Sequence, residues 1–391
     1  MTDKYEVPAE RRRHAHRAVR RRFAALHGMR GRTLLLGAAI GALCLVSAPI
    51  FAAHAATAPL DRDGQHDFDF MVGTWNIHVL RLVHPLTGSK TWVTMEGTKV
   101  VRPIWNGRAQ LEQVEADGPN GHFESMGLML YNSKSHEWSV NFANGAQGTL
   151  SPAAFGAFRD GRGEFFNSDT YDGRTIAVRY TWSDITPTTH HLEQAFSADG
   201  GKSWEPNLKV TLTRATGAIH PNIPPVTAIS AGQHDFDWQL GRWNVHMRRL
   251  QHPLTGSTTW TELKGTVIVR PIWGGRANIA EITSEGPSGK LEFLSLRLFD
   301  PQAHQWSLNF ASDSSGVLST PMVGQFKEGR GEFYDYEPIN GRMTWVRFRF
   351  EDITGGSNRD EQAFSVDGAR TWETNWINTS TRVQPIPQAS R

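Results

Sequence analysis

The sequence predicts an all-β protein made of two tandem antiparallel β-barrels, each with about eight to ten strands. Three observations support this fold class: a duplication that covers most of the chain, apolar residues at alternate positions, and turns rich in Gly and Asn between the alternating segments. Neither copy contains a convincing helical period. Closing such a sheet into a barrel buries one of its faces and leaves no exposed edge strand.

The N-terminal segment has the composition of an export signal. Residues 1–32 hold ten Lys and Arg residues against three acidic ones, and an uncharged apolar run from Thr33 to Ala53 follows. The run ends in Ala53-His54-Ala55, a small-x-small cleavage pattern, so we predict a signal peptide over residues 1–55 and a periplasmic or secreted protein. Two alternatives remain open: a twin-arginine signal at Arg20-Arg21-Arg22, and an uncleaved membrane anchor.

Removal of this leader changes the charge of the protein. The whole chain has 41 basic and 39 acidic residues and a formal charge of +2, whereas without residues 1–55 it has 31 and 36, or about −5. The basic balance therefore belongs to the leader, and we predict no nucleic-acid partner. Cys44, the single cysteine, lies in the leader, so the remaining chain is predicted to have no disulfide and no thiol chemistry.

An internal duplication defines the domains. Motifs of the first half recur 168 residues later: His66-Asp67-Phe68-Asp69 as His234-Asp235-Phe236-Asp237, Val101-Arg102-Pro103-Ile104-Trp105 as Val269 to Trp273, and Gly161-Arg162-Gly163-Glu164-Phe165 as Gly329 to Phe333. Each copy has the length of a complete domain, far longer than a solenoid or propeller repeat. We predict barrels over residues 66–214 and 234–382, joined by a linker rich in Pro and Ala over residues 215–233.

Within each copy the apolar residues alternate along the strands. Met126, Leu128 and Leu130 alternate with other residues, and Leu294, Leu296 and Leu298 do so in the second copy. Such a period of two predicts one apolar face per strand.

The ends of each copy resemble a known superfamily. Gly73-Thr74-Trp75 and Gly241-Arg242-Trp243 open the first long strand of the two copies, and the last strands finish on Arg214 and Arg382. This pattern resembles the calycins, the superfamily of lipocalins and fatty-acid-binding proteins. The resemblance implies that Trp75 and Trp243 plug the closed end of each barrel beneath an arginine of the last strand. A guanidinium above an indole adds cation–π attraction.

Candidate ligand-binding residues follow from the alternation of the first strand. If Trp75 and Trp243 face inward, so do Arg81 and Arg249. An arginine inside an apolar barrel is costly unless it is paired, so it anchors an anionic ligand group, meets an internal carboxylate, or lies at the open rim. Candidate internal partners are Glu193 or Gln194 in the first copy and Glu361 or Gln362 in the second. Which member of each pair points inward stays open.

No cofactor and no metal site are predicted. The copies are also similar to nitrobindin-like barrels, and that resemblance raises haem, which needs an axial histidine inside the barrel. His78 points outward by alternation, and His84 and His136 lie near turns, so none can be assigned to that role. No zinc spacing, P-loop, dinucleotide fingerprint or nucleophile elbow is present, and we predict no catalytic residues.

These observations favour an exported binding protein that holds a small hydrophobic or amphipathic molecule inside each barrel. Two alternatives stay open. One is a barrel enzyme of the cyclase or isomerase type that acts on a hydrophobic substrate. The other is an envelope interaction module whose barrels are filled. No membrane span is predicted after signal cleavage, and the sequence leaves the oligomeric state open.

Overall fold

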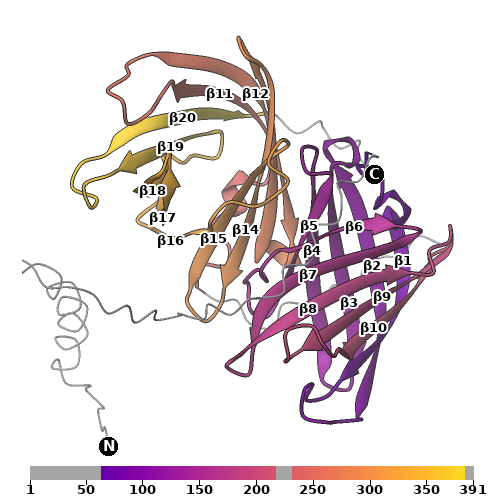
Figure 1. Cartoon of the computed structure of the whole chain (residues 1–391). Helices are drawn as coiled ribbons and strands as arrows, with labels where there is room; N and C mark the ends of the chain where they lie inside the picture. The colour runs from indigo at the N-terminus through magenta and orange to yellow at the C-terminus, as the bar shows by residue number, and fades with distance from the viewer. Residues whose placement is uncertain (1–62, 217–230, 384–391) are drawn as a thin grey trace, which may run out of the picture. The chain divides into compact units, whose positions relative to one another are not determined.

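The computed structural model describes residues 63–216 and 231–383, and their strands form two closed barrels of ten antiparallel strands (Figure 1). This confirms the predicted fold class. The predicted signal peptide and most of the predicted linker lie outside the described residues. Within the described residues, no helix has the length and apolar character needed to cross a bilayer.

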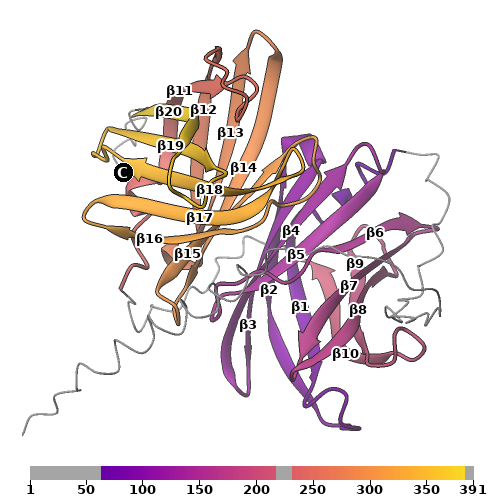
Figure 2. The same ribbon diagram turned by 60° about the vertical axis from the view of Figure 1, so that its left-hand side comes forward.

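The first barrel is a meander in which each strand pairs with the next and β1 pairs with β10 to close the sheet (Figure 2). Two short 3₁₀ turns, η1 (Asp69–Met71) and η2 (Trp105–Gly107), precede β1 and β3. The strands are β1 (Gly73–Leu82), β2 (Trp92–Ile104), β3 (Ala109–Gly118), β4 (Gly121–Asn132), β5 (Glu137–Asn144), β6 (Ala154–Arg159), β7 (Arg162–Tyr171), β8 (Arg174–Ser183), β9 (Thr189–Ser197) and β10 (Glu205–Arg214).

The second barrel repeats this order, with β11 paired to β20. Its 3₁₀ turns are η3 (Asp237–Gln239) and η4 (Trp273–Gly275). Its strands are β11 (Gly241–Leu250), β12 (Trp260–Ile272), β13 (Ala277–Gly286), β14 (Gly289–Asp300), β15 (Gln305–Ser312), β16 (Met322–Lys327), β17 (Arg330–Ile339), β18 (Arg342–Glu351), β19 (Ser357–Ser365) and β20 (Glu373–Arg382).

Two-residue turns fix the register of several hairpins. Asp160-Gly161 joins β6 to β7 with φ angles of 49° and 74°, and Asp172-Gly173 joins β7 to β8 with 49° and 72°. Positive φ at both positions is the conformation whose twist matches that of paired strands, and Asp-Gly adopts it readily. These turns therefore hold the inward and outward faces of β6, β7 and β8 in place.

The expectation of one apolar face per strand is wrong for β4 and β14. Every residue from Met126 to Tyr131 is buried. Met129 and Tyr131 pack in the core of the first barrel, whereas Met126, Leu128 and Leu130 belong to a separate apolar cluster. That cluster also contains Leu294, Leu296 and Leu298 and other residues of the second barrel. The outer faces of β4 and β14 are therefore buried as well.

The residues of this shared cluster come in pairs separated by 168 positions, such as Trp105 and Trp273. Reciprocal ion pairs accompany it. Arg108 Nη2 lies 2.8 Å from Glu292 Oε2, and Arg276, its equivalent in the second copy, contacts Glu124, the equivalent of Glu292. Both barrels lie in one compact unit of the chain.

The interiors of the two barrels are packed differently. The first barrel has one continuous apolar cluster that runs from Phe68 and Met71 to Leu212. The second barrel has two, one around Phe236, Phe333 and Phe350 and the other around Trp243, Val245 and Met247. This division leaves space inside the second barrel.

Candidate functional site

A cavity of about 690 Å³ lies inside the second barrel and is lined by residues of both apolar clusters. Its apolar walls include Val245, Met247, Val267, Ile282, Leu291, Phe293, Phe310, Phe348 and Phe350. Its polar residues include Gln239, Arg249, Ser295, Arg297, Glu337, Asp360, Gln362 and Asn378. An apolar cavity with a few convergent polar groups is typical of small-molecule sites.

Arg297 on β14 is the central polar residue of the cavity, with only 4% of its surface exposed. Its Nη1 donates to Gln239 Oε1 and, at 3.4 Å, to Asn278 Oδ1, and its Nε donates to Ser295 Oγ at 3.3 Å. These acceptors are all neutral, and within the described residues no carboxylate forms an ion pair with Arg297. Burial lowers the pKa of Arg297 to about 10, so the side chain remains a cation at neutral pH.

Aromatic rings support this guanidinium. Its central carbon lies 4.7 Å from the ring centroid of Phe236 and 5.5 Å from that of Phe350. Such contacts attract a cation weakly but leave its charge uncompensated. The fold therefore fixes the position of the Arg297 guanidinium, but these contacts offset only part of the free-energy cost of burying its charge.

Asp360 on β19 is the buried acid of the same cavity and is 5% exposed. Asn378 Nδ2 donates to its Oδ2 at 2.5 Å, Asn358 Nδ2 donates to its Oδ1 at 3.3 Å, and Trp376 Nε1 donates to Asn378 Oδ1 at 2.7 Å. Burial raises the pKa of Asp360 to about 6, and the hydrogen bond from Asn378 and the charge of Arg297 oppose that rise. Its carboxyl group therefore titrates close to neutral pH.

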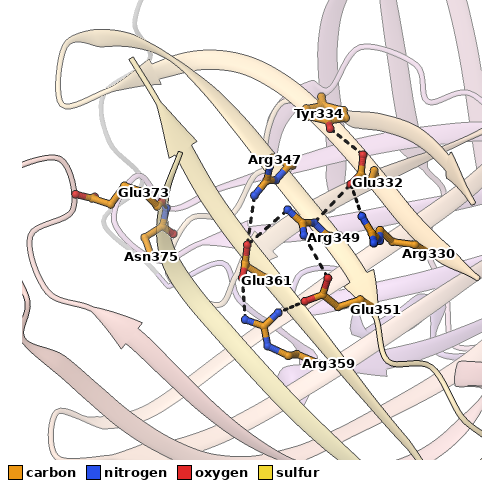
Figure 3. Close-up of polar contacts among 10 residues, drawn as sticks. All are labelled: Arg330, Glu332, Tyr334, Arg347, Arg349, Glu351, Arg359, Glu361, Glu373 and Asn375. Atoms are coloured by element: carbon orange, nitrogen blue, oxygen red, sulfur yellow. Dashed lines mark hydrogen bonds and ion pairs between the residues drawn. The ribbon is translucent and has the colours of Figure 1, made fainter. Parts of the chain in front are cut away.

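The structure separates the two residues that the sequence left open on β19. Asp360 and Gln362 line the cavity, so Glu361 between them points away from it. Figure 3 shows Glu361 in a cluster of ion pairs instead, with its carboxylate 3.3 Å from Arg347 and 2.7 Å from Arg359. Because Arg347 and Arg359 already neutralise it, Glu361 is not available to a molecule in the cavity.

Arg249 lies at the exposed end of the cavity. Its side chain is exposed, lines the cavity, and has its guanidinium carbon 5.3 Å from the ring centroid of Trp376. The equivalent Arg81 of the first barrel is also exposed. Both arginines are thus exposed, and of the two only Arg249 lines this cavity.

The remaining candidates of the first barrel are paired within it. Gln194 Nε2 donates to the hydroxyl of buried Tyr180 at 2.9 Å. Glu193 lies 3.8 Å from Arg179. Among the described residues, neither Gln194 nor Glu193 contacts an arginine as deeply buried as Arg297.

The ends of both barrels have the geometry expected for a plug. Arg214 pairs with Trp75 across β1 and β10, and Arg382 pairs with Trp243 across β11 and β20. In each barrel the guanidinium carbon lies 4.2 Å from the centroid of the buried indole. These residues seal the barrels and do not line the cavity.

The residues that carry and surround the two buried charges of the cavity differ between the copies, whereas Arg249 and Gln362 have the same residue types, Arg81 and Gln194, in the first copy. At the equivalent positions the first barrel has Met71 for Gln239, Met129 for Arg297, Leu192 for Asp360, Leu208 for Trp376 and Val210 for Asn378. All five of these apolar residues pack in or against the core of the first barrel. At these five positions, apolar core residues of the first barrel are thus replaced by the polar groups and the tryptophan that line the cavity of the second barrel.

The first barrel holds a different polar pair. Lys99 Nζ lies 2.8 Å from Glu112 Oε2, and both side chains are buried. The second copy has Val267 and Ala280 at these positions. Lys99 and Glu112 neutralise each other, so they leave no net charge for a ligand to satisfy.

Sequence reasoning missed Arg297 and Asp360. Arg297 stands between Leu296 and Leu298, and a polar residue within an alternating apolar strand is normally assigned to the solvent face. The equivalent segment of the first copy, Met126 to Tyr131, is apolar at every position, which is typical of a strand buried on both faces. A position-by-position comparison of the copies in that run would have identified Arg297 as buried.

Comparisons with known proteins identify no family for this chain. No family and no curated protein matches its sequence. Among solved structures, the S-type phycobiliprotein lyase from Guillardia theta is similar with a TM-score of 0.29 and 11% identity, over 40% of this chain and 96% of that chain. A protein of unknown function of the DUF3598 family from Nostoc punctiforme has a TM-score of 0.25 and 11% identity, over 82% and 100% of the two chains.

Proposed function

We propose that the chain is an exported small-molecule binding protein whose second barrel holds one amphipathic molecule. The apolar part of the molecule fills the cavity, and its polar group is an anion that contacts Arg297. The observation that carries this proposal is the buried guanidinium of Arg297, which faces a largely apolar cavity and has no ion-pair partner among the described residues. Export, to the periplasm or beyond, follows from the predicted signal peptide.

Arg297 is a buried cation with no carboxylate of the described residues within ion-pair distance. A buried charge is expensive unless it is paired, and hydrogen bonds from Arg297 to Gln239, Asn278 and Ser295 compensate only part of that cost. An anionic group would supply the missing charge through hydrogen bonds that are stronger than those to neutral acceptors. The aliphatic and aromatic walls favour an apolar chain or ring behind that group.

The first barrel supports a stoichiometry of one molecule per chain. Its equivalents of the cavity residues, Met71, Met129 and Leu192 among them, fill the interior. Its buried charges are paired with each other. We assign it a structural role, because its outer face completes the apolar cluster against which β14 packs.

Isothermal titration of the full chain with decane sulfonate tests the proposal. We expect one binding site per chain. Arg297→Met, which installs the residue of the first copy, should weaken binding by about 10- to 150-fold, since hydrogen bonds to charged groups contribute about 1.5 to 3 kcal/mol. Arg81→Met is the matched control in the first barrel and should leave the affinity unchanged. Two equivalent sites, or equal binding by wild type and Arg297→Met, would refute the proposal.

A second candidate function is acid–base catalysis on a hydrophobic substrate. Asp360 and Arg297 line one cavity, and an acid with a pKa of about 6 can both accept and donate a proton near neutral pH. The test is deuterium incorporation into a carbon–hydrogen bond of the molecule that co-purifies with the protein, incubated in D₂O. Incorporation by wild type but not by Asp360→Asn supports catalysis, and equal incorporation by both refutes it.

A further inference from the structure

The cavity in the second barrel is lined by ionisable groups of both signs, and they differ in burial. Its two deeply buried ionisable groups are Arg297 and Asp360. Arg249 and Glu337 also line it, but Arg249 is exposed and Glu337 is half-buried. The buried part of the cavity thus contains one cation and one carboxyl group, at a separation too large for an ion pair.

Within the described part of the chain, the groups packed around Asp360 provide no second buried cation on the cavity side. Its partners on the neighbouring strands are Phe350 on β18 and Asn378 on β20, and neither is titratable. Arg359 also acts on Asp360. It stands next to Asp360 on β19, and its guanidinium is bound to Glu351 and Glu361 in the ion-pair cluster of Figure 3. Among the described residues, Arg297 is therefore the only buried cation of the cavity that both Asp360 and a bound anion can share.

An anionic ligand would compete with Asp360 for that cation. With the ligand in place, two negative charges would share one positive charge in a space with little water. A second like charge in a desolvated site favours the neutral form of a carboxyl group. Asp360 is the easier of the two to neutralise, because burial alone already shifts its pKa toward neutrality.

We infer that the second barrel takes up an anionic amphipathic molecule together with one proton, which is transferred from solvent to a carboxylate oxygen of Asp360. The inference rests on the proposed function, since it requires binding of an anion at Arg297. The bound state then contains one buried cation, one buried anion and a neutral carboxylic acid. The charges of Arg297 and the bound anion then balance each other, as those of Lys99 and Glu112 do in the first barrel.

Coupling to a proton makes the affinity depend on pH. Above the pKa of Asp360 in the empty cavity, uptake of one proton weakens binding by up to about tenfold per pH unit. The protein would therefore capture its ligand in a mildly acidic medium and release it as the pH rises. A neutral ligand of equal length would show no such dependence.

The experiment is isothermal titration of the full chain with decane sulfonate in buffers of different ionisation enthalpy at pH 7.5. Because the sulfonate stays ionised, any proton uptake belongs to the protein. We expect close to one proton per bound molecule for wild type and none for Asp360→Asn, which should still bind. Decanol, the neutral control, should bind without proton uptake in both proteins.

The outcomes separate the inference from the function on which it rests. Binding of decane sulfonate to wild type without proton uptake, or the same uptake in Asp360→Asn, overturns the inference and leaves the proposed function intact. If neither decane sulfonate nor decanol binds, the proposed function itself fails. If Asp360→Asn does not fold, the affinity of wild type at pH 6, 7 and 8 decides: a constant affinity overturns the coupling.

Discussion

The guanidinium carbon of Arg214 lies 4.2 Å from the ring centroid of Trp75, and the two residues are partners across the strands that close the first barrel. The arginine also donates to the carbonyl oxygens of Val72 and Phe70, each at 3.0 Å. The indole Nε1 donates to Met71 O at 2.7 Å. The first and last strands and the chain that enters the barrel are thus tied together at one point.

Trp75→Ala should therefore lower the free energy of unfolding by about 3 to 5 kcal/mol, the usual cost of removing a fully buried large aromatic side chain. Urea unfolding of the full chain measures it. Asn76→Ala, at the exposed neighbouring position, is the control and should change the free energy by no more than about 0.5 kcal/mol. A loss below about 1 kcal/mol for Trp75→Ala would show that the indole is not a plug.

The buried ion pair of the first barrel should depend on both of its members. Glu112→Ala leaves Lys99 as an unpaired buried cation and should destabilise the protein by about 3 to 5 kcal/mol. The double variant Lys99→Val with Glu112→Ala installs the residues of the second copy and should recover much of that loss. Thermal unfolding of the three proteins provides the comparison, and a double variant less stable than Glu112→Ala would contradict the account.

Asp335 should make the stability fall as the pH rises. Burial and the neighbouring Glu337 raise its pKa to about 7, and its Oδ1 has no hydrogen-bond partner in the described part of the chain. The folded protein therefore binds this proton more tightly than the unfolded chain, and the stability decreases as pH rises from about 4 to about 7. Asp335→Asn, the residue of the first copy, should flatten this slope in urea unfolding at several pH values. An unchanged slope would show that Asp335 is not the source of this pH dependence.

His190 should have the opposite effect. It is fully buried in the first barrel, and neither ring nitrogen has a hydrogen-bond partner among the residues that the structure describes. Burial and the charge of Lys99 lower its pKa to about 3. Below about pH 6.5 the unfolded chain takes up a proton on this histidine more readily than the folded protein does. The free energy of unfolding is therefore highest above about pH 6.5 and falls as the pH decreases toward 3. His190→Asn, the residue of the second copy, should reduce the loss in acid. Equal acid sensitivity of the two proteins would contradict this assignment.

Much of the architecture could be predicted because its signals are local. Alternation on β1, with Trp75, Ile77 and Val79 buried and Asn76 and His78 exposed, indicates the inward face directly. The duplication then assigns the same face to β11. Ten strands per barrel lies within the range that the spacing of turns predicted.

The site depends on contacts that alternation does not encode. An apolar outer face, such as that of Met126, Leu128 and Leu130, gives no sign of what covers it. Arg297 interrupts the equivalent run in the second copy, so its burial follows only from packing on both sides of β14. Alternation assigned Arg81 and Arg249 to the inward face and left open whether they bind a ligand, pair with a carboxylate or lie at the rim; in the structure both side chains are exposed.

Native mass spectrometry of the full chain purified from its own host shows whether the second barrel holds an anionic molecule at Arg297. We expect one co-purifying anionic amphipathic molecule per chain, retained by Arg81→Met and lost from Arg297→Met. A wild-type chain that carries no molecule, or an Arg297→Met chain that carries the same molecule in the same amount, would contradict it.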